Sequence, residues 1–129
     1  IKITIVGDII CDKEMLKSAE TANKKYYNFN NMFYPLGGYF NDSSYIICNL
    51  ETPISNFKLT DSVFSFNNPE ELIKSLKIIG INVFSLANNH VLDRGDAGLD
   101  STIKNIKKYG LQYFGIDNNF ANLSKSPKS

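Results

Sequence analysis

The chain has 129 residues, 43% of them hydrophobic and 12% aromatic, which is enough for one domain, or part of one, with its own apolar core. A net charge of +1 with scattered lysines excludes the long-range field by which a protein attracts nucleic acid or an anionic membrane surface. No apolar run approaches the ~20 residues of a membrane-spanning helix, and two cysteines do not make a disulfide framework.

The first half of the chain predicts two strands with one helix between them. The apolar residues 1–6 predict a strand, and Asp12 is placed to cap a helix that continues over residues 13–25. Residues 26–42 are rich in aromatic residues and asparagine and contain a proline and a Gly-Gly pair, so we expect a loop with at most a short helix. A second buried strand is expected over residues 44–50.

The second half predicts two more strands and two helices. Residues 54–66 form a polar excursion, either a hairpin or an extended segment. A helix is expected over residues 69–80, because proline and acidic residues open the segment and glycine ends it. A strand over 81–86, a helix over 96–110 and a short strand over 111–115 complete the pattern.

This alternation of strands and helices predicts the α/β fold class. Strands that are apolar throughout are typical of a largely parallel sheet flanked by helices, with both of its faces covered. In open sheets of this type, ligands bind beyond the carboxyl ends of the strands. Functional residues are therefore expected at that edge.

Each of the three long predicted strands ends in polar residues, which are Gly7-Asp8, Asn49-Leu50-Glu51 and Asn88-Asn89-His90. If the strands are parallel neighbours, these groups meet at one edge. Carboxylate and amide oxygens there suit Mn, Mg or Ca, and an imidazole extends the choice to Zn or Fe. The segment SLANNHVLDRGDAG also contains the only histidine and the only arginine of the chain. Glycine-rich nucleotide loops and a GxSxG nucleophile motif are absent from the sequence.

Four segments together resemble the bacterial poly-gamma-glutamate capsule-synthesis (CapA-type) family, which belongs to the calcineurin-like metallophosphoesterase superfamily. They are GDIICD, YIICNLETPIS, PEELIKSL and SLANNHVLDRGDAGLDSTIKNIKKYGLQYFG. The resemblance covers residues 1–119 and leaves 120–129 as a frayed tail. It implies the amino-terminal part of a metallophosphoesterase-like α/β sandwich, because the family's later histidine motifs would lie downstream of this chain.

The resemblance also implies site residues. Asp8, Glu51 and Asn89 would be metal ligands, and His90 would approach the scissile phosphate with Asp93 orienting its ring. The cation would be Mn, Mg, Zn or Fe, bound weakly by this chain.

Two further residues are candidate substrate contacts, and two positions depart from the superfamily's motifs. Asn88 and Arg94 would contact the anionic substrate. Ile10 stands where the superfamily's first motif has a histidine, and Val91 stands where an acidic residue follows the motif's histidine. One of the two superfamily metal positions therefore lacks a ligand.

Two functions remain open at this point. In one, the protein is a capsule-assembly protein that binds anionic polymer or membrane-bound synthesis partners at the cell envelope, outside the cytoplasm. In the other, it is a metal-dependent phosphoesterase acting on an envelope polymer or phosphoester. The residues alone also allow a purely structural interpretation, in which NNHVLDRG is a hydrogen-bonded turn and Asp93 only satisfies His90. The chain itself is expected to be soluble and not to bind nucleic acid.

Overall fold

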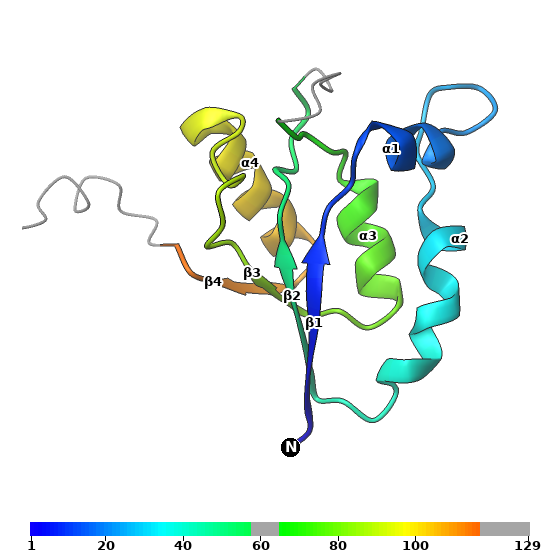
Figure 1. Cartoon of the computed structure of the whole chain (residues 1–129), viewed down its shortest axis with the longest axis vertical. Coiled ribbons are helices and arrows are strands. Elements are labelled where there is room, and N and C mark those ends of the chain that lie inside the picture. The colour runs from blue at the N-terminus through cyan, green and yellow to red at the C-terminus, as the bar shows by residue number, and fades with distance from the viewer. Residues whose placement is uncertain (58–64, 117–129) are drawn as a thin grey trace, which may run out of the picture.

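The computed structural model describes residues 1–57 and 65–116 and shows an α/β fold (Figure 1). All pairings between its four strands are parallel, in the order β1-β2-β3-β4. The strands are β1 (Ile3–Ile9), β2 (Tyr45–Leu50), β3 (Val83–Ser85) and β4 (Gln112–Phe114). The helices are α1 (Lys13–Ala19), α2 (Asn30–Phe33), the 3-10 helix η1 (Tyr34–Phe40), α3 (Glu71–Ile78) and α4 (Gly95–Lys108). The predicted fold class is confirmed.

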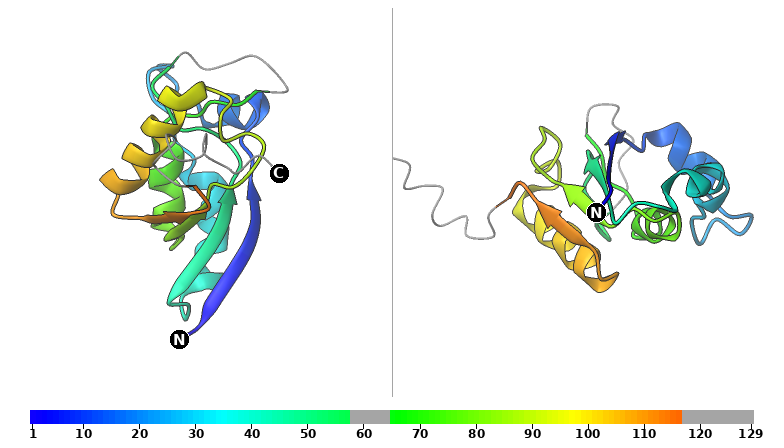
Figure 2. Two further views of the ribbon diagram at one scale, coloured as in Figure 1. Left: turned by 90° about the vertical axis from the view of Figure 1, so that its left-hand side faces the viewer. Right: turned by 90° about the horizontal axis from the view of Figure 1, so that it is seen from below.

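The longer helices pack on one face of the sheet. Each strand lies next to the strand that precedes it in the sequence. Because connections between parallel strands are right-handed as a rule, adding every strand at the same edge of the sheet places the successive helices on the same face. Figure 2 shows α3 and α4 together on that side. The core lies between them and the sheet. Its fully buried side chains are Leu50, Leu72, Ile73, Leu76, Phe84, Leu99 and Ile106.

The opposite face of the sheet carries no helix in the described part of the chain. Ile3 and Ile5 of β1 are 57% and 76% exposed, and Tyr45 and Phe114 are also exposed. The prediction that both faces are covered is therefore wrong for the described residues. Apolar strand composition indicated burial, but the constant direction of the crossovers leaves one face open.

Two segments differ from the predicted elements. Asp12 caps α1 as expected, accepting a hydrogen bond from the backbone of Met15, but the helix ends at Ala19. The chain then turns extended at Glu20, which forms an isolated bridge with Tyr27. Residues 26–42 hold more helix than predicted, because Phe29 and Phe33 enter the core and anchor α2 and η1.

The remaining predictions fall partly outside the described residues. The excursion 54–66 begins at Ile54, which forms a parallel bridge with Asn68, two residues beyond its end. Its residues 58–64 lie outside the described ranges. The domain boundary at residue 119 and the tail 120–129 also lie outside them. None of the described helices has the length and apolarity to cross a membrane.

Candidate functional site

A bulge in β1 determines where Asp8 points. Between the pairs Ile5–Ile47 and Asp8–Asn49, two β1 residues face a single β2 residue. In a regular strand, alternation would place Gly7 beside Asn49, on the open face of the sheet. The extra residue places Asp8 there instead, which is how a bulge re-aims a side chain.

Four side chains from three strand ends form a hydrogen-bonded group, which we call the strand-end cluster: Asp8, Asn49, Glu51 and Asn88. The Nδ2 atom of Asn49 donates to Asp8 Oδ1 at 2.8 Å and to Glu51 Oε2 at 2.9 Å. Asn88 Nδ2 donates to Asn49 Oδ1 at 3.1 Å. The ends of β1, β2 and β3 therefore meet at one edge, with two carboxylates sharing one amide nitrogen.

The two asparagines of the NNH motif have different surroundings. Asn88 is half-buried, and its Nδ2 also donates to the carbonyl of Leu50 at 2.9 Å. Its Oδ1 accepts the backbone N–H of His90 at 3.0 Å. Asn89 is exposed, and its side chain makes no hydrogen bond with the described part of the chain. The structure thus brings Asn88, rather than Asn89, into contact with the cluster.

His90 is held by Asp93 and by Phe66. The Nδ1 atom of His90 lies 2.9 Å from Asp93 Oδ2, and the same oxygen accepts the backbone N–H of Phe66 at 2.6 Å. The Phe66 ring lies against the imidazole, with 4.6 Å between ring centroids. An ionised carboxylate only accepts hydrogen bonds, so the proton resides on Nδ1 and Nε2 is the nitrogen that can take up another.

The surrounding loop is also a tightly bonded turn. Asp93 N donates to His90 O at 3.1 Å, and Gly95, with a φ of 61°, donates to Leu92 O at 2.8 Å. A turn of this kind was the structural interpretation of NNHVLDRG. Because Asn88 bonds both the His90 backbone and Asn49, the turn is directly linked to the strand-end cluster.

Arg94 is tied to the protein through one of its terminal nitrogens. Its Nη1 donates to Ser65 Oγ at 2.8 Å and to the carbonyl of Asp93 at 2.7 Å. The side chain is partly buried. Arg94 therefore holds the Ser65–Phe66 segment over the His90 turn and places a positive charge beside it.

A second set of polar side chains lies directly behind Glu51, and we call it the buried polar network. Its members are Thr52, Ser55, Asn67, Asn68 and Thr102, all buried. Asn68 Nδ2 donates to Thr52 Oγ1 at 2.7 Å and to the Cys11 carbonyl at 2.9 Å. Thr102 Oγ1 accepts the backbone N–H of Ile54 at 2.9 Å. The network fixes the backbone that follows Glu51, and Glu51 N itself bonds the carbonyl of Ile9.

The two cysteines do not take part in this chemistry. Both are free and buried. Burial raises the pKa of Cys48 to about 12, and burial together with the nearby Asp12 charge raises the pKa of Cys11 to about 12. Both remain neutral thiols at physiological pH, so neither supplies a nucleophilic thiolate.

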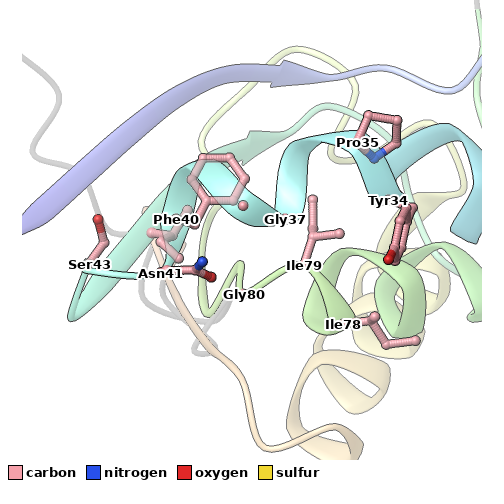
Figure 3. A pocket seen from close by; sticks show the side chains of 11 residues that line it. Tyr34, Pro35, Gly37, Phe40, Asn41, Ser43, Ile78, Ile79 and Gly80 are labelled. Carbon is pink, nitrogen blue, oxygen red and sulfur yellow. The ribbon is translucent and has the colours of Figure 1, made fainter.

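A surface hollow of about 670 Å³ lies at the other end of the sheet (Figure 3). Phe40, Asn41 and Ser43 lie toward one end of it, and Tyr34 and Ile78 toward the other. The hollow has a mixed polar and apolar lining and is next to the start of β2. It does not belong to the strand-end cluster.

The chain matches the family described as bacterial capsule synthesis protein PGA_cap over residues 2–126. It belongs to this family. The capsule biosynthesis protein CapA of Bacillus anthracis is 32% identical over 126 residues, which cover 94% of this chain and 29% of that protein. The PGA biosynthesis protein CapA of Bacillus subtilis (strain 168) is 26% identical over 125 residues, covering 95% of this chain and 32% of that protein. The chain thus spans about a third of the length of these capsule-synthesis relatives.

The donor set found in this member of the capsule synthesis family suits a hard cation held partly by water. The described residues include no group of three or more His, Cys, Asp or Glu side chains placed to hold a metal ion. Asp8 and Glu51 nevertheless converge on one atom, and amide oxygens lie beside them. Mg²⁺ is commonly held by one or two carboxylates together with waters and substrate oxygens. Zn and Fe fit less well, because the strand-end cluster contains no imidazole or thiolate, the ligands that favour these metals.

Two residues of the site had no predicted role. Asn49 is the last residue but one of β2 and stands two residues before Glu51, so alternation alone could have placed both side chains on one face. Phe66 lies in the polar excursion and has no sequence signal for contact with His90, which is 24 positions away in the printed sequence.

Proposed function

We propose that this protein acts in the synthesis of a bacterial capsule by binding an anionic polymer, of the poly-gamma-glutamate type, at the carboxyl edge of its sheet with the help of a divalent cation. Membership of the capsule synthesis family supports the process. The observation that carries the site is the convergence of Asp8 and Glu51, from two different strands, on a single amide nitrogen. Like charges held this close favour a cation between them.

The residues of the edge have separate tasks in this proposal. Asp8 and Glu51 hold Mg²⁺ or Mn²⁺, and water completes the shell, because the exposed Asn89 side chain is not hydrogen-bonded to the cluster. When bound, the cation supplies positive charge that offsets the carboxylates or phosphates of the polymer. Arg94 adds a fixed positive charge beside the His90 turn, and Asn88 holds that turn against the cluster.

The His90–Asp93 pair favours a second candidate, a phosphoesterase acting on an envelope polymer or its precursor. Asp93 keeps the proton on Nδ1 and would stabilise an imidazolium, so Nε2 can exchange a proton with a leaving oxygen. Phe66 packs on the ring and limits its rotation. These are the attributes of a general acid, and a binding module does not need them.

Cation binding tests the first proposal. Calorimetric titration of the protein with Mg²⁺ or Mn²⁺ should show binding that falls about tenfold or more in Asp8→Asn and in Glu51→Gln, since each variant removes a charged ligand. Asp100→Asn, an exposed carboxylate change on α4, is the matched control and should bind normally. Equal binding by all of these proteins, or none by the wild type at millimolar concentration, would contradict the cation site.

A His90→Gln variant separates the two candidates. If the protein is a phosphoesterase, the variant should lose turnover of a phosphodiester substrate while cation affinity is unchanged. If it is a binding module, wild type and variant should both lack turnover, and both should restore capsule when placed in a strain without the gene. The family also supports an envelope location for the complete protein, which cell fractionation would test.

A further inference from the structure

We propose that the side-chain amide of Asn49 bridges Asp8 and Glu51 in the cation-free protein, in the place that the cation takes when it binds. On cation binding, the amide rotates so that its oxygen and nitrogen exchange positions. The inference rests on the cation site proposed above and adds a residue and a mechanism of coupling to it. Asn49 was given no role by the sequence, and it is the side chain through which the three strand ends are joined.

The geometry of the bridge leads to this conclusion. Both hydrogens of one NH₂ group are donated, one to Asp8 and one to Glu51, from a nitrogen 2.8 and 2.9 Å from the two oxygens. The amide thus places its partial positive charge between two carboxylates. A cation bound to the same two oxygens, at about 2.1 Å from each, would be repelled by the partial positive charge of the two N–H groups that point at those oxygens. The NH₂ group must therefore leave when the cation arrives.

The simplest departure is rotation of the amide, which directs Asn49 Oδ1 toward the cation and its NH₂ toward Asn88. After this rotation the NH₂ of Asn49 would face the Nδ2 of Asn88, which in the cation-free protein donates to Asn49 Oδ1 at 3.1 Å. Two NH₂ groups cannot bond each other, so Asn88 has to move away from Asn49 or rotate, and rotation would also break the bond that its Nδ2 donates to the Leu50 carbonyl at 2.9 Å. Either movement displaces its Oδ1 from the backbone N–H of His90, which it now accepts at 3.0 Å. Cation binding is thereby transmitted through two amides to the His90 turn.

The test is whether a cation replaces the amide. Asn49→Leu keeps the approximate shape of the side chain and removes its donors, so thermal unfolding in EDTA should occur about 3–6 °C below wild type. Saturating Mg²⁺ should close at least about half of that gap, because the cation supplies the charge that the amide no longer supplies. Asn31→Leu, at an exposed asparagine of α2, is the matched control and should show no Mg²⁺-dependent gap.

A second measurement covers the case in which Asn49→Leu does not fold. The chain has one histidine, so labelling histidine with ¹⁵N yields a single backbone signal. Mg²⁺ titration of the wild type should shift that signal and, in a second sample labelled at asparagine, the side-chain NH₂ signals of Asn49 and Asn88. The inference is overturned if Mg²⁺ binds and these signals stay in place, or if Asn49→Leu binds Mg²⁺ and its deficit persists. Absence of Mg²⁺ binding by the wild type overturns this inference together with the cation site.

Discussion

The buried polar network and the strand-end cluster are neighbours with opposite character. Glu51 belongs to the cluster and Thr52, the next residue, belongs to the network. The network consists of neutral side chains, and Thr52, Asn68 and Thr102 are only 2%, 1% and 2% exposed. The cluster contains two carboxylates and lies at the open edge of the sheet, where Asp8 is exposed.

This difference separates two roles within one sequence motif. Buried neutral amides and hydroxyls lower the cost of burying backbone groups and so determine where the chain runs. Carboxylates at an exposed edge contribute little to folding and keep lone pairs for a ligand. In NLETPIS, Thr52 and Ser55 position the backbone, whereas Glu51 and Asn49 face outward to the cluster. Mutations in the two groups should therefore differ in their effects.

The largest loss is expected for Asn68→Ala in the network. The change leaves the Cys11 carbonyl and Thr52 Oγ1 without their donor and opens a small cavity, so the free energy of unfolding should fall by about 2–3 kcal/mol. Urea denaturation measures it, with Asn31→Ala as the exposed control. Because Asn68 Oδ1 is buried without a hydrogen-bond partner among the described residues, a loss below about 0.5 kcal/mol would show that the amide is poorly satisfied and contributes nothing.

A smaller loss is expected for Thr102→Val on α4. The shape is conserved, but the backbone N–H of Ile54 loses its acceptor inside the core, which should cost about 1–2 kcal/mol. Thr102→Ser retains the hydroxyl and should recover most of this loss. A larger loss in Thr102→Ser than in Thr102→Val would mean that the methyl group, rather than the hydrogen bond, is important.

In the cluster, Glu51→Gln should change stability by less than about 1 kcal/mol when divalent cations are absent, and the change should be toward greater stability. Glutamine still accepts the Asn49 bond, while the repulsion between Glu51 and Asp8 disappears. Thermal unfolding in EDTA tests this. A loss as large as that in Asn68→Ala would place Glu51 among the structural residues and remove the contrast between the two groups.

The smallest effect is expected for the surface pair of Glu70 and Lys108, whose Oε2 and Nζ atoms lie 2.6 Å apart. The hydrogen bond from Lys108 lowers the pKa of Glu70, and the same bond raises the pKa of Lys108. The pair therefore contributes stability above the ordinary pKa of a glutamate, and loses it as pH falls through the lowered pKa of Glu70. The pair also loses this contribution to stability as pH rises through the raised pKa of Lys108.

Glu70→Gln should accordingly lower the melting temperature by no more than about 2 °C at pH 7. Melting curves of wild type and variant should converge as the medium is acidified below the pKa of Glu70. A difference that persists in acid would show that Tyr109, which donates to the same carboxylate oxygen, carries the effect instead.

Local pattern was sufficient for much of the fold. The proline and acidic residues at its start and the glycine at its end predicted the helix over 69–80, and local pattern also predicted the helix over 96–110, because such signals lie within one segment. Parallel order then predicted that the strand ends meet. The lengths of α1 and of η1 were not predictable in this way, since they depend on contacts that Tyr27, Phe29 and Phe33 make elsewhere.

By itself, the sequence determined the fold class, the family and the presence of acidic and amide groups at three strand ends, because each follows from periodicity or from a contiguous motif. Only the tertiary structure decided which of these groups touch. The β1 bulge that directs Asp8 to Asn49 is a property of pairing between two strands. The contact of Phe66 with His90 joins segments that are distant in the chain. Register and packing between segments are set by the whole core, so no single stretch of sequence contains them.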